Sequence, residues 1–348
     1  EQDKGVKIEI IGILSHIRSD KAIEILEAQL QKESDKEVKE SDKDVKIAII
    51  NTLISFRRGD TINLLFTKLL QKEGTEKEVK IVLVQALYQL MQDKAANILI
   101  VELQKEGTEK EVKIAILKQL NYIRSINTVT PLLDLLQKEE TDKDIKIAII
   151  QTLGNTGSAE VVAPLTEMFK KEGSEKEVKI AILTAFGFIK TDETAKLLIN
   201  QLHEGTEKEI RIASVNALSM IGIDKAVEPL IKQLKKETDK DVKINIIRIL
   251  GSVKGDNAGK ATDALIEAYS VEQVEEVKAY TIRTLGTFLQ NTGAEAVSKK
   301  YGINIKLTRY LLTHPKYFLM TVLDSGLKQK MNEVSYQLNR ERTNHPKE

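Results

Sequence analysis

Apolar residues recur along this chain with the period of an α-helix. After a valine or isoleucine, here called the anchor, apolar side chains follow at positions +4, +5, +8 and +11, as in Ile116, Leu117, Leu120 and Ile123. This spacing places them on one side of a helix. A second apolar stretch follows each first one, as in residues 128–137. The pattern therefore predicts antiparallel pairs of helices, each with an inner helix that carries the anchor and an outer helix after it.

The predicted pair recurs at a nearly constant interval. The anchors are Val6, Val45, Val79, Val112, Ile145, Val178, Ile210, Val242 and Val277. From Val45 to Val242, successive anchors lie 34, 33, 33, 33, 32 and 32 residues apart. A fixed period of this length indicates a stacked array, because one helix pair cannot bury its apolar faces alone. The sequence predicts an all-α solenoid of about eight to nine hairpins over residues 1–295.

Each regular copy starts with a charged motif, such as Thr75-Glu76-Lys77-Glu78 before the anchor Val79. A hydroxyl followed three residues later by an acid is the signature of a capping box. We therefore predict that the hydroxyl caps the inner helix and that the acid bonds back to the cap amide. Seven nearly identical copies make a catalytic role for these carboxylates a poor explanation. Alanine is frequent at +3, where a small side chain lets another helix approach.

The same copies carry a resemblance to a known family. Pro131, Pro164 and Pro229 are each followed by leucine early in an outer helix, where a missing N–H does little harm. After the turn come an anchor with a basic residue, then alanine and Leu-Gly, as in Ile145-Lys146, Ala148 and Leu153-Gly154. Residues 6–290 resemble HEAT repeats of the short bacterial kind, including those of bilin lyases. The resemblance implies a right-handed, armadillo-type superhelix whose inner helices line the concave face. It also implies a ladder of acids and the basic residues after the anchors.

Two stretches depart from the repeat. Residues 34–46 hold the charged motif twice, seven residues apart, which we interpret as a tolerated duplication or a functional loop. Residues 296–348 hold ten Lys or Arg against four Asp or Glu, together with five aromatic residues. We predict that this second stretch is a C-terminal helical cap over the last apolar face. A basic, aromatic docking segment for an acidic partner or an anionic lipid is the alternative.

Composition limits the classes of function. The chain has no cysteine and a net charge of +1, which excludes thiol catalysis and a global attraction to nucleic acid or membranes. No apolar run reaches the length of a transmembrane helix. The first residue is Glu, so we expect a processed or truncated chain whose signal has been removed. We expect a soluble monomer of the bacterial cytoplasm or periplasm.

No recognisable catalytic or cofactor site is present in the sequence. The four histidines, His16, His203, His314 and His345, are scattered, and one His-Glu pair does not make a metal site. The glycines lie near predicted helix ends and form no phosphate-binding loop. The lysines alternate with acids and Trp is absent, which disfavours the basic, aromatic surface of HEAT-like DNA glycosylases. We predict no enzyme activity, no cofactor, no metal and no nucleic-acid partner.

The inner helices leave two rows of positions pointing away from the core. At position +6 the side chains are polar and none is acidic, although Asp and Glu number 52 of 348 residues. At +10 several side chains are aromatic or apolar. We predict that these rows bind an extended peptide or a helix of a partner protein. Alternatively, +10 packs between neighbouring inner helices and +6 is only solvated. The candidate residues are Asn51, Gln85, Lys118, Tyr122, Gln151, Phe188, Asn216, Met220, Arg248 and Arg283.

The sequence thus favours the function of a non-enzymatic scaffold for protein–protein interaction. Two alternatives remain open. The chain could be the HEAT module of a lyase-like or other enzyme complex that grips a substrate protein, or it could bind nucleic acid. Phosphate contacts would give the last alternative a steep dependence on salt.

Overall fold

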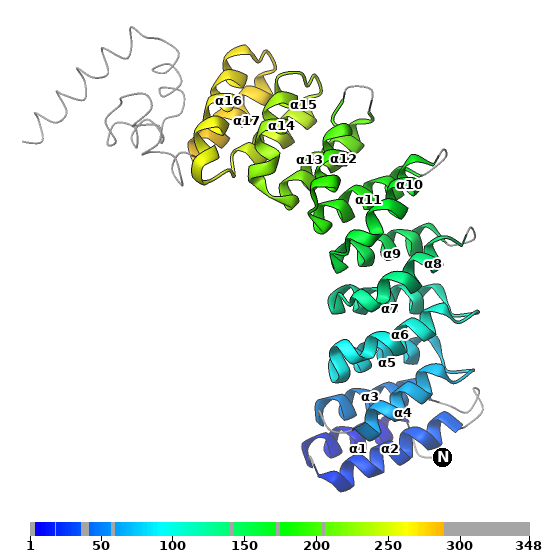
Figure 1. Cartoon of the computed structure of the whole chain (residues 1–348). Coiled ribbons are helices and arrows are strands. Elements are labelled where there is room, and N and C mark those ends of the chain that lie inside the picture. The colour runs from blue at the N-terminus through cyan, green and yellow to red at the C-terminus, as the bar shows by residue number, and fades with distance from the viewer. Residues whose placement is uncertain are drawn as a thin grey trace, which may run out of the picture. The chain divides into compact units, whose positions relative to one another are not determined.

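The computed structural model describes residues 4–17, 19–35, 42–56, 60–138, 142–171, 175–203 and 206–288. These residues form α-helices and short 3-10 helices, without a β-strand (Figure 1). They belong to two compact units, an N-terminal unit, Glu1–Ala185, and a C-terminal unit, Phe186–Glu348. Each unit is a stack of helix hairpins in the order that the sequence predicts. The all-α solenoid is confirmed.

In the N-terminal unit, the first five inner helices pack one against the next, and the first four outer helices each pack against the inner helix that follows. The inner helices are α1 (Lys4–Ile17), α3 (Lys43–Phe56), α5 (Lys77–Met91), α7 (Lys110–Ile123), α9 (Lys143–Thr156) and α11 (Lys176–Ile189), of which α11 runs across the boundary. The outer helices are α2 (Asp20–Asp35), α4 (Asp60–Gln71), α6 (Ala95–Gln104), α8 (Val129–Leu136) and α10 (Val162–Lys170). Three outer helices follow a single 3-10 turn, at Gln92–Lys94, Ile126–Thr128 and Ala159–Val161.

In the C-terminal unit the same arrangement continues. The inner helices are α13 (Lys208–Ile221), α15 (Lys240–Leu250) and α17 (Glu275–Phe288). The outer helices are α12 (Asp192–Asn200), α14 (Ile223–Leu234) and α16 (Ala258–Val271), and a 3-10 turn at Gly255–Asn257 precedes α16. Pro131 and Pro164 lie in the first turns of α8 and α10, as predicted. Pro229 instead lies inside α14, because this helix begins at Ile223, directly after Gly222.

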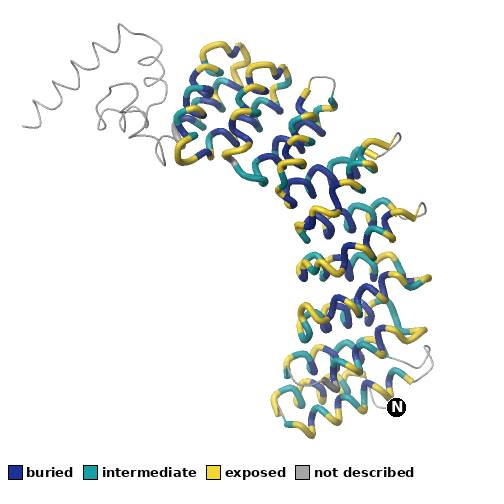
Figure 2. Tube along the Cα trace, viewed as in Figure 1, coloured by how far each residue is buried: buried dark blue, intermediate teal, exposed yellow. Residues whose placement is uncertain are grey.

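The predicted core positions are buried. Each anchor from Val45 to Val277 is less than one-tenth exposed, and the +4 position behind it is also buried. Buried residues follow the lines where helices meet within each hairpin and between hairpins (Figure 2). Val6 is the exception, at 46% exposed, because no described helix packs on that side of α1.

The capping-box prediction is wrong in its register. The N-cap residue is the acid after the hydroxyl, so the inner helices begin one residue later than predicted. The Asp142 carboxylate accepts the amide of Asp144, as its short side chain allows. Glu76 makes no such bond. The Thr108 hydroxyl donates a hydrogen bond to the carbonyl of Glu102 at 3.0 Å. It thus caps the C-terminal end of the preceding outer helix.

Neighbouring inner helices come close at a position that the sequence analysis did not single out. At Gly154 in α9, an added Cβ would lie 2.7 Å from Cα of Ala185 in α11. In the C-terminal unit, an added Cβ at Gly187 would lie 3.0 Å from Cα of Ala217. The close approach therefore runs between glycine at +9 and a small residue at +7 of the next inner helix.

Several predictions concern residues outside the described ranges. The C-terminal segment 296–348 lies there, and so does the middle of the duplicated stretch 34–46. Both predictions therefore stay predictions. None of the helices in the described ranges has the length and hydropathy that a membrane span requires.

Candidate functional site: the inner-helix face

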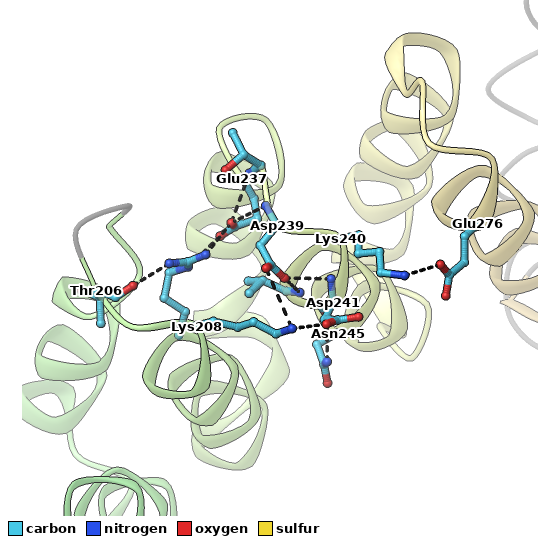
Figure 3. Close-up of polar contacts among 11 residues, drawn as sticks. Thr206, Lys208, Glu237, Asp239, Lys240, Asp241, Asn245 and Glu276 are labelled. Atoms are coloured by element: carbon cyan, nitrogen blue, oxygen red, sulfur yellow. Dashed lines mark hydrogen bonds and ion pairs between the residues drawn. The ribbon is translucent and has the colours of Figure 1, made fainter. Parts of the chain in front are cut away.

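The first turns of neighbouring inner helices are joined by a ladder of ion pairs. The first lysine of one helix contacts the acid one residue further along in the next helix. Lys43 Nζ lies 3.1 Å from Glu78 Oε1, and Lys77 Nζ lies 3.0 Å from Glu111 Oε1. In the C-terminal unit Lys240 Nζ contacts Glu276 Oε2 at 2.6 Å (Figure 3). These lysines are therefore held along one edge of each unit, and the ladder neutralises the acids that flank the inner-helix face.

The ladder changes the ionisation of its members. A hydrogen bond from Lys4 holds the pKa of Asp44 below its usual range, and one from Lys208 does the same for Asp241. For Glu78, a backbone amide contributes most to the lowered pKa, followed by Lys43. A hydrogen bond to Glu276 raises the pKa of Lys240. The ion pairs therefore stabilise the charged forms of Asp44, Glu78, Asp241 and Lys240.

The basic residue after the anchor makes a second, more buried set of contacts. Lys46 Nζ lies 3.0 Å from Glu76 Oε2, and Lys80 Nζ lies 3.3 Å from Glu102 Oε1. Further pairs are Arg211 with Glu237 and Lys243 with Glu272. The acid–base ladder that the family resemblance implied is confirmed at these positions. Glu102 and Glu237 come from the ends of outer helices, so these pairs also join the two helices of a hairpin.

The predicted +6 row is on the surface in both units. In the N-terminal unit Asn51, Gln85, Lys118 and Gln151 are exposed. In the C-terminal unit Arg248 and Arg283 are exposed and Asn216 is half-buried. Arg248 Nη2 donates to Oδ1 of Asn216, one repeat earlier, at 2.7 Å. The row is thus a polar strip in each unit. Within it, Arg248 and Asn216 are two predicted site residues that the fold brings into contact.

The +10 row is divided between exposed and packed side chains. Tyr122 is 66% exposed, and its ring contacts Tyr88 of the preceding inner helix in a tilted pair with centroids 6.1 Å apart. In the C-terminal unit Phe188 is 40% exposed and Met220 is half-buried. The side chain of Asn155 donates to Asn121 of the preceding helix. The +10 row therefore packs in part between inner helices and still presents aromatic surface, and the binding interpretation stays a prediction.

Comparison with known proteins agrees with this architecture. A family model for HEAT repeats matches residues 99–175 and 171–243. Residues 99–243 therefore carry HEAT repeats. The crystal structure of Kap121p superposes with a TM-score of 0.53 over 95% of the chain, at 12% sequence identity. The chain spans only 43% of the length of Kap121p, so the likeness is one of fold. No curated protein sequence matches the chain.

The inner helices carry one row that the sequence interpretation missed. Position +2 is isoleucine in every copy from Ile8 to Ile244, and from Ile47 onward these side chains are half-buried. On a helical wheel, +2 lies about 40° from +6, at 100° per residue, so the isoleucines border the polar strip. The signal for this row in the sequence was an apolar residue that recurs at one position outside the buried side of each inner helix.

A pocket opens beside the aromatic pair in the N-terminal unit. It has a volume of about 370 Å³ and is lined by Ile54, Tyr88, Gln89, Leu90, Gln92 and Asp93. Its position follows from Tyr88 and Gln89, which occupy +9 and +10 of α5. The sequence did not predict this pocket, because it depends on where α5 ends against α3.

The described residues of the hairpins do not provide the ligand set of a metal site. There, His, Cys, Asp and Glu side chains do not gather in threes as a metal site would need. His203 contacts the hydroxyl of Thr206 within 3.2 Å, in the turn before α13. Its neighbour Glu204 lies outside the described residues. The face therefore offers hydrogen bonds, apolar contact and aromatic surface, which suit binding.

Proposed function

We propose that this HEAT-repeat protein is a non-enzymatic scaffold that binds a partner protein or peptide on its inner-helix face. The observation that carries the proposal is the exposed Tyr122, whose ring contacts Tyr88 beside the acid-free +6 strip. Aromatic rings that are exposed yet already held by a neighbour lose little side-chain entropy on binding, and tyrosine is enriched at binding hot spots.

The polar strip supports the same function. Asn51, Gln85 and Gln151 are exposed, and their side chains make no hydrogen bond within the described residues. Carboxamides both donate and accept hydrogen bonds, so they can satisfy the backbone of a partner segment. The ladder beside them holds the inner helices in register, which presents these groups at a regular spacing.

The experiment is affinity selection from a displayed random peptide library, followed by measurement of Kd for the selected peptides. Tyr122→Ala and Lys118→Glu should each weaken binding by about tenfold or more, as expected for residues at a hot spot. The matched control is Val101→Ser, which changes a 57% exposed apolar residue on the outer helix α6. Two results would refute the proposed face. In the first, the peptides bind Tyr122→Ala and Lys118→Glu as tightly as the natural chain. In the second, Val101→Ser weakens binding as well.

A further inference from the structure

We infer that the occupant of the inner-helix face in the N-terminal unit is a proline-rich segment in the polyproline II conformation, with an apolar residue at every third position. This inference rests on the proposed function and specifies the partner. It starts from the isoleucines at +2, one for each inner helix, which are Ile47, Ile81, Ile114, Ile147 and Ile180. They form an apolar row that is half-buried in the described N-terminal unit.

The spacing of the row selects the conformation of the ligand. Packed helices lie about 8–10 Å apart, and the tight contact of Gly154 with Ala185 shows how closely two inner helices approach. A polyproline II helix rises about 3.1 Å per residue with three residues per turn, or about 9 Å per turn. One apolar side chain per turn therefore meets one isoleucine per repeat. A β-strand presents side chains on one face every ~7 Å and loses register after one repeat.

The amide row distinguishes this ligand from an α-helix. An α-helix satisfies its own backbone groups, whereas a polyproline II segment has no internal hydrogen bonds. Its carbonyls need donors, and proline contributes no N–H of its own. Asn51, Gln85 and Gln151 are exposed carboxamides beside the isoleucine row, without a hydrogen-bond partner among the described residues. Their N–H groups can supply one donor per repeat along much of the row.

The aromatic pair and its pocket fit the same ligand. Grooves that bind polyproline II segments are lined by aromatic rings, on which proline rings pack. Tyr88 and Tyr122 form such a pair, with an interplanar angle of 31°. The adjoining pocket of about 370 Å³, with Ile54 and Leu90 in its wall, can accept one apolar side chain or proline ring.

Charge complementarity adds one more feature. The acids at the edge of the face are engaged by the ladder, as Glu78 is by Lys43 and Glu111 by Lys77. In the +6 row of the N-terminal unit, Lys118 is the one cation, and it has no ion pair within the described residues. The segment is therefore largely uncharged and carries one acidic residue opposite Lys118.

The test uses the full chain and three synthetic peptides. The first has roughly five Leu-Pro-Pro turns with one Pro replaced by Glu. The second has the same composition with its leucines at unequal intervals. The third is an amphipathic α-helical peptide with leucines seven residues apart, a spacing of about 10.5 Å. Titration followed by fluorescence anisotropy should show the first peptide binding at least about tenfold tighter than the other two, a difference of about 1.4 kcal/mol.

Charge reversal tests whether the acidic residue of the peptide lies opposite Lys118. Rescue by the complementary peptide would also show that the variant is folded. Lys118→Glu should weaken the first peptide by about tenfold, and a peptide with Lys in place of its Glu should restore the affinity to that variant. Ile114→Ser should also weaken binding, whereas Val101→Ser on α6 should not. Equal binding of the unequally spaced peptide, or no binding of the first peptide, would overturn the inference. Tighter binding of the helical peptide with sensitivity to Tyr122→Ala would overturn it too, yet leave the proposed function standing.

Discussion

Arg211 donates two parallel hydrogen bonds to the carboxylate of Glu237, and both side chains are buried. Nε donates to Oε2 at 3.2 Å and Nη2 donates to Oε1 at 3.0 Å. Glu237 also accepts bonds from Gln233 and from the backbone amides of Thr238 and Asp239. This one carboxylate therefore links the end of α14 to the start of α15 and to α13.

The Arg211–Glu237 pair should be the most costly ion pair to break. Arg211→Met leaves a buried carboxylate without its cation, which should lower the free energy of unfolding by about 3–5 kcal/mol. Lys235→Met is the control, because Lys235 and Glu267 form an exposed pair that should contribute less than about 1 kcal/mol. Urea unfolding followed by circular dichroism measures both. Equal losses in the two variants would contradict this account of the buried pair.

A pair of glycines tests the close approach of inner helices. Gly154→Ala places a methyl group 2.7 Å from Cα of Ala185, so it should destabilise the protein by about 1–3 kcal/mol through overpacking. Gly12→Ala in α1 meets nothing within 4 Å and should stabilise the protein by about 0.5–1 kcal/mol, because alanine loses less backbone entropy in a helix. Thermal unfolding of the two variants should give shifts of opposite sign. A stabilised Gly154→Ala variant would show that the helices are not this close.

The hydroxyl at the start of each charged motif should act on the helix before it. Thr108→Val leaves the buried carbonyl of Glu102 without its side-chain donor, so it should cost about 1–2 kcal/mol. Thr184→Val is a matched control, since the Thr184 hydroxyl bonds to the carbonyl of Ile180, which lies inside a helix. Hydrogen exchange should show faster opening at the end of α6 in Thr108→Val. Faster opening confined to the first turn of α7 would instead restore the capping-box interpretation.

The ladder should make stability depend on pH at the acidic end. The pKa values of Asp44, Glu78 and Glu111 are lowered in the folded state, so the ladder contributes stability above the unfolded pKa of about 4. That contribution should be lost as the pH falls through the folded pKa values. The variant Asp44→Asn, Glu78→Gln, Glu111→Gln should lose less stability between about pH 5 and pH 2 than the natural chain. Parallel curves for the two proteins would contradict a stabilising ladder.

The sequence predicted the repeat, the hairpins and the core because these depend on local periodicity. The anchor and the residue at +4 are buried in each copy from Val45 onward. The register of the cap could not be predicted, because threonine is a preferred N-cap residue and glutamate is not, so the sequence favours Thr75 over Glu76. The choice depends on the Leu69 carbonyl, which the Thr75 hydroxyl binds at 2.9 Å.

The candidate site was predictable only in part. The +6 and +10 rows follow from the helical wheel, so Gln85 and Tyr122 could be placed on the surface from the sequence. The contact of Tyr122 with Tyr88 depends on how far each inner helix is shifted along the next, which no single helix specifies. The isoleucines at +2 were visible in the repeat. Within a single helix, however, an apolar residue next to the buried side cannot be told apart from a core residue.

Hydrogen exchange with and without a selected peptide tests the central claim most directly. If the partner binds the inner-helix face, protection on binding should appear in α5 and α7, around Gln85, Lys118 and Tyr122, while α6 and α8 should exchange as in the free protein. Protection confined to the outer helices α6 and α8, with α5 and α7 unchanged, would contradict the account.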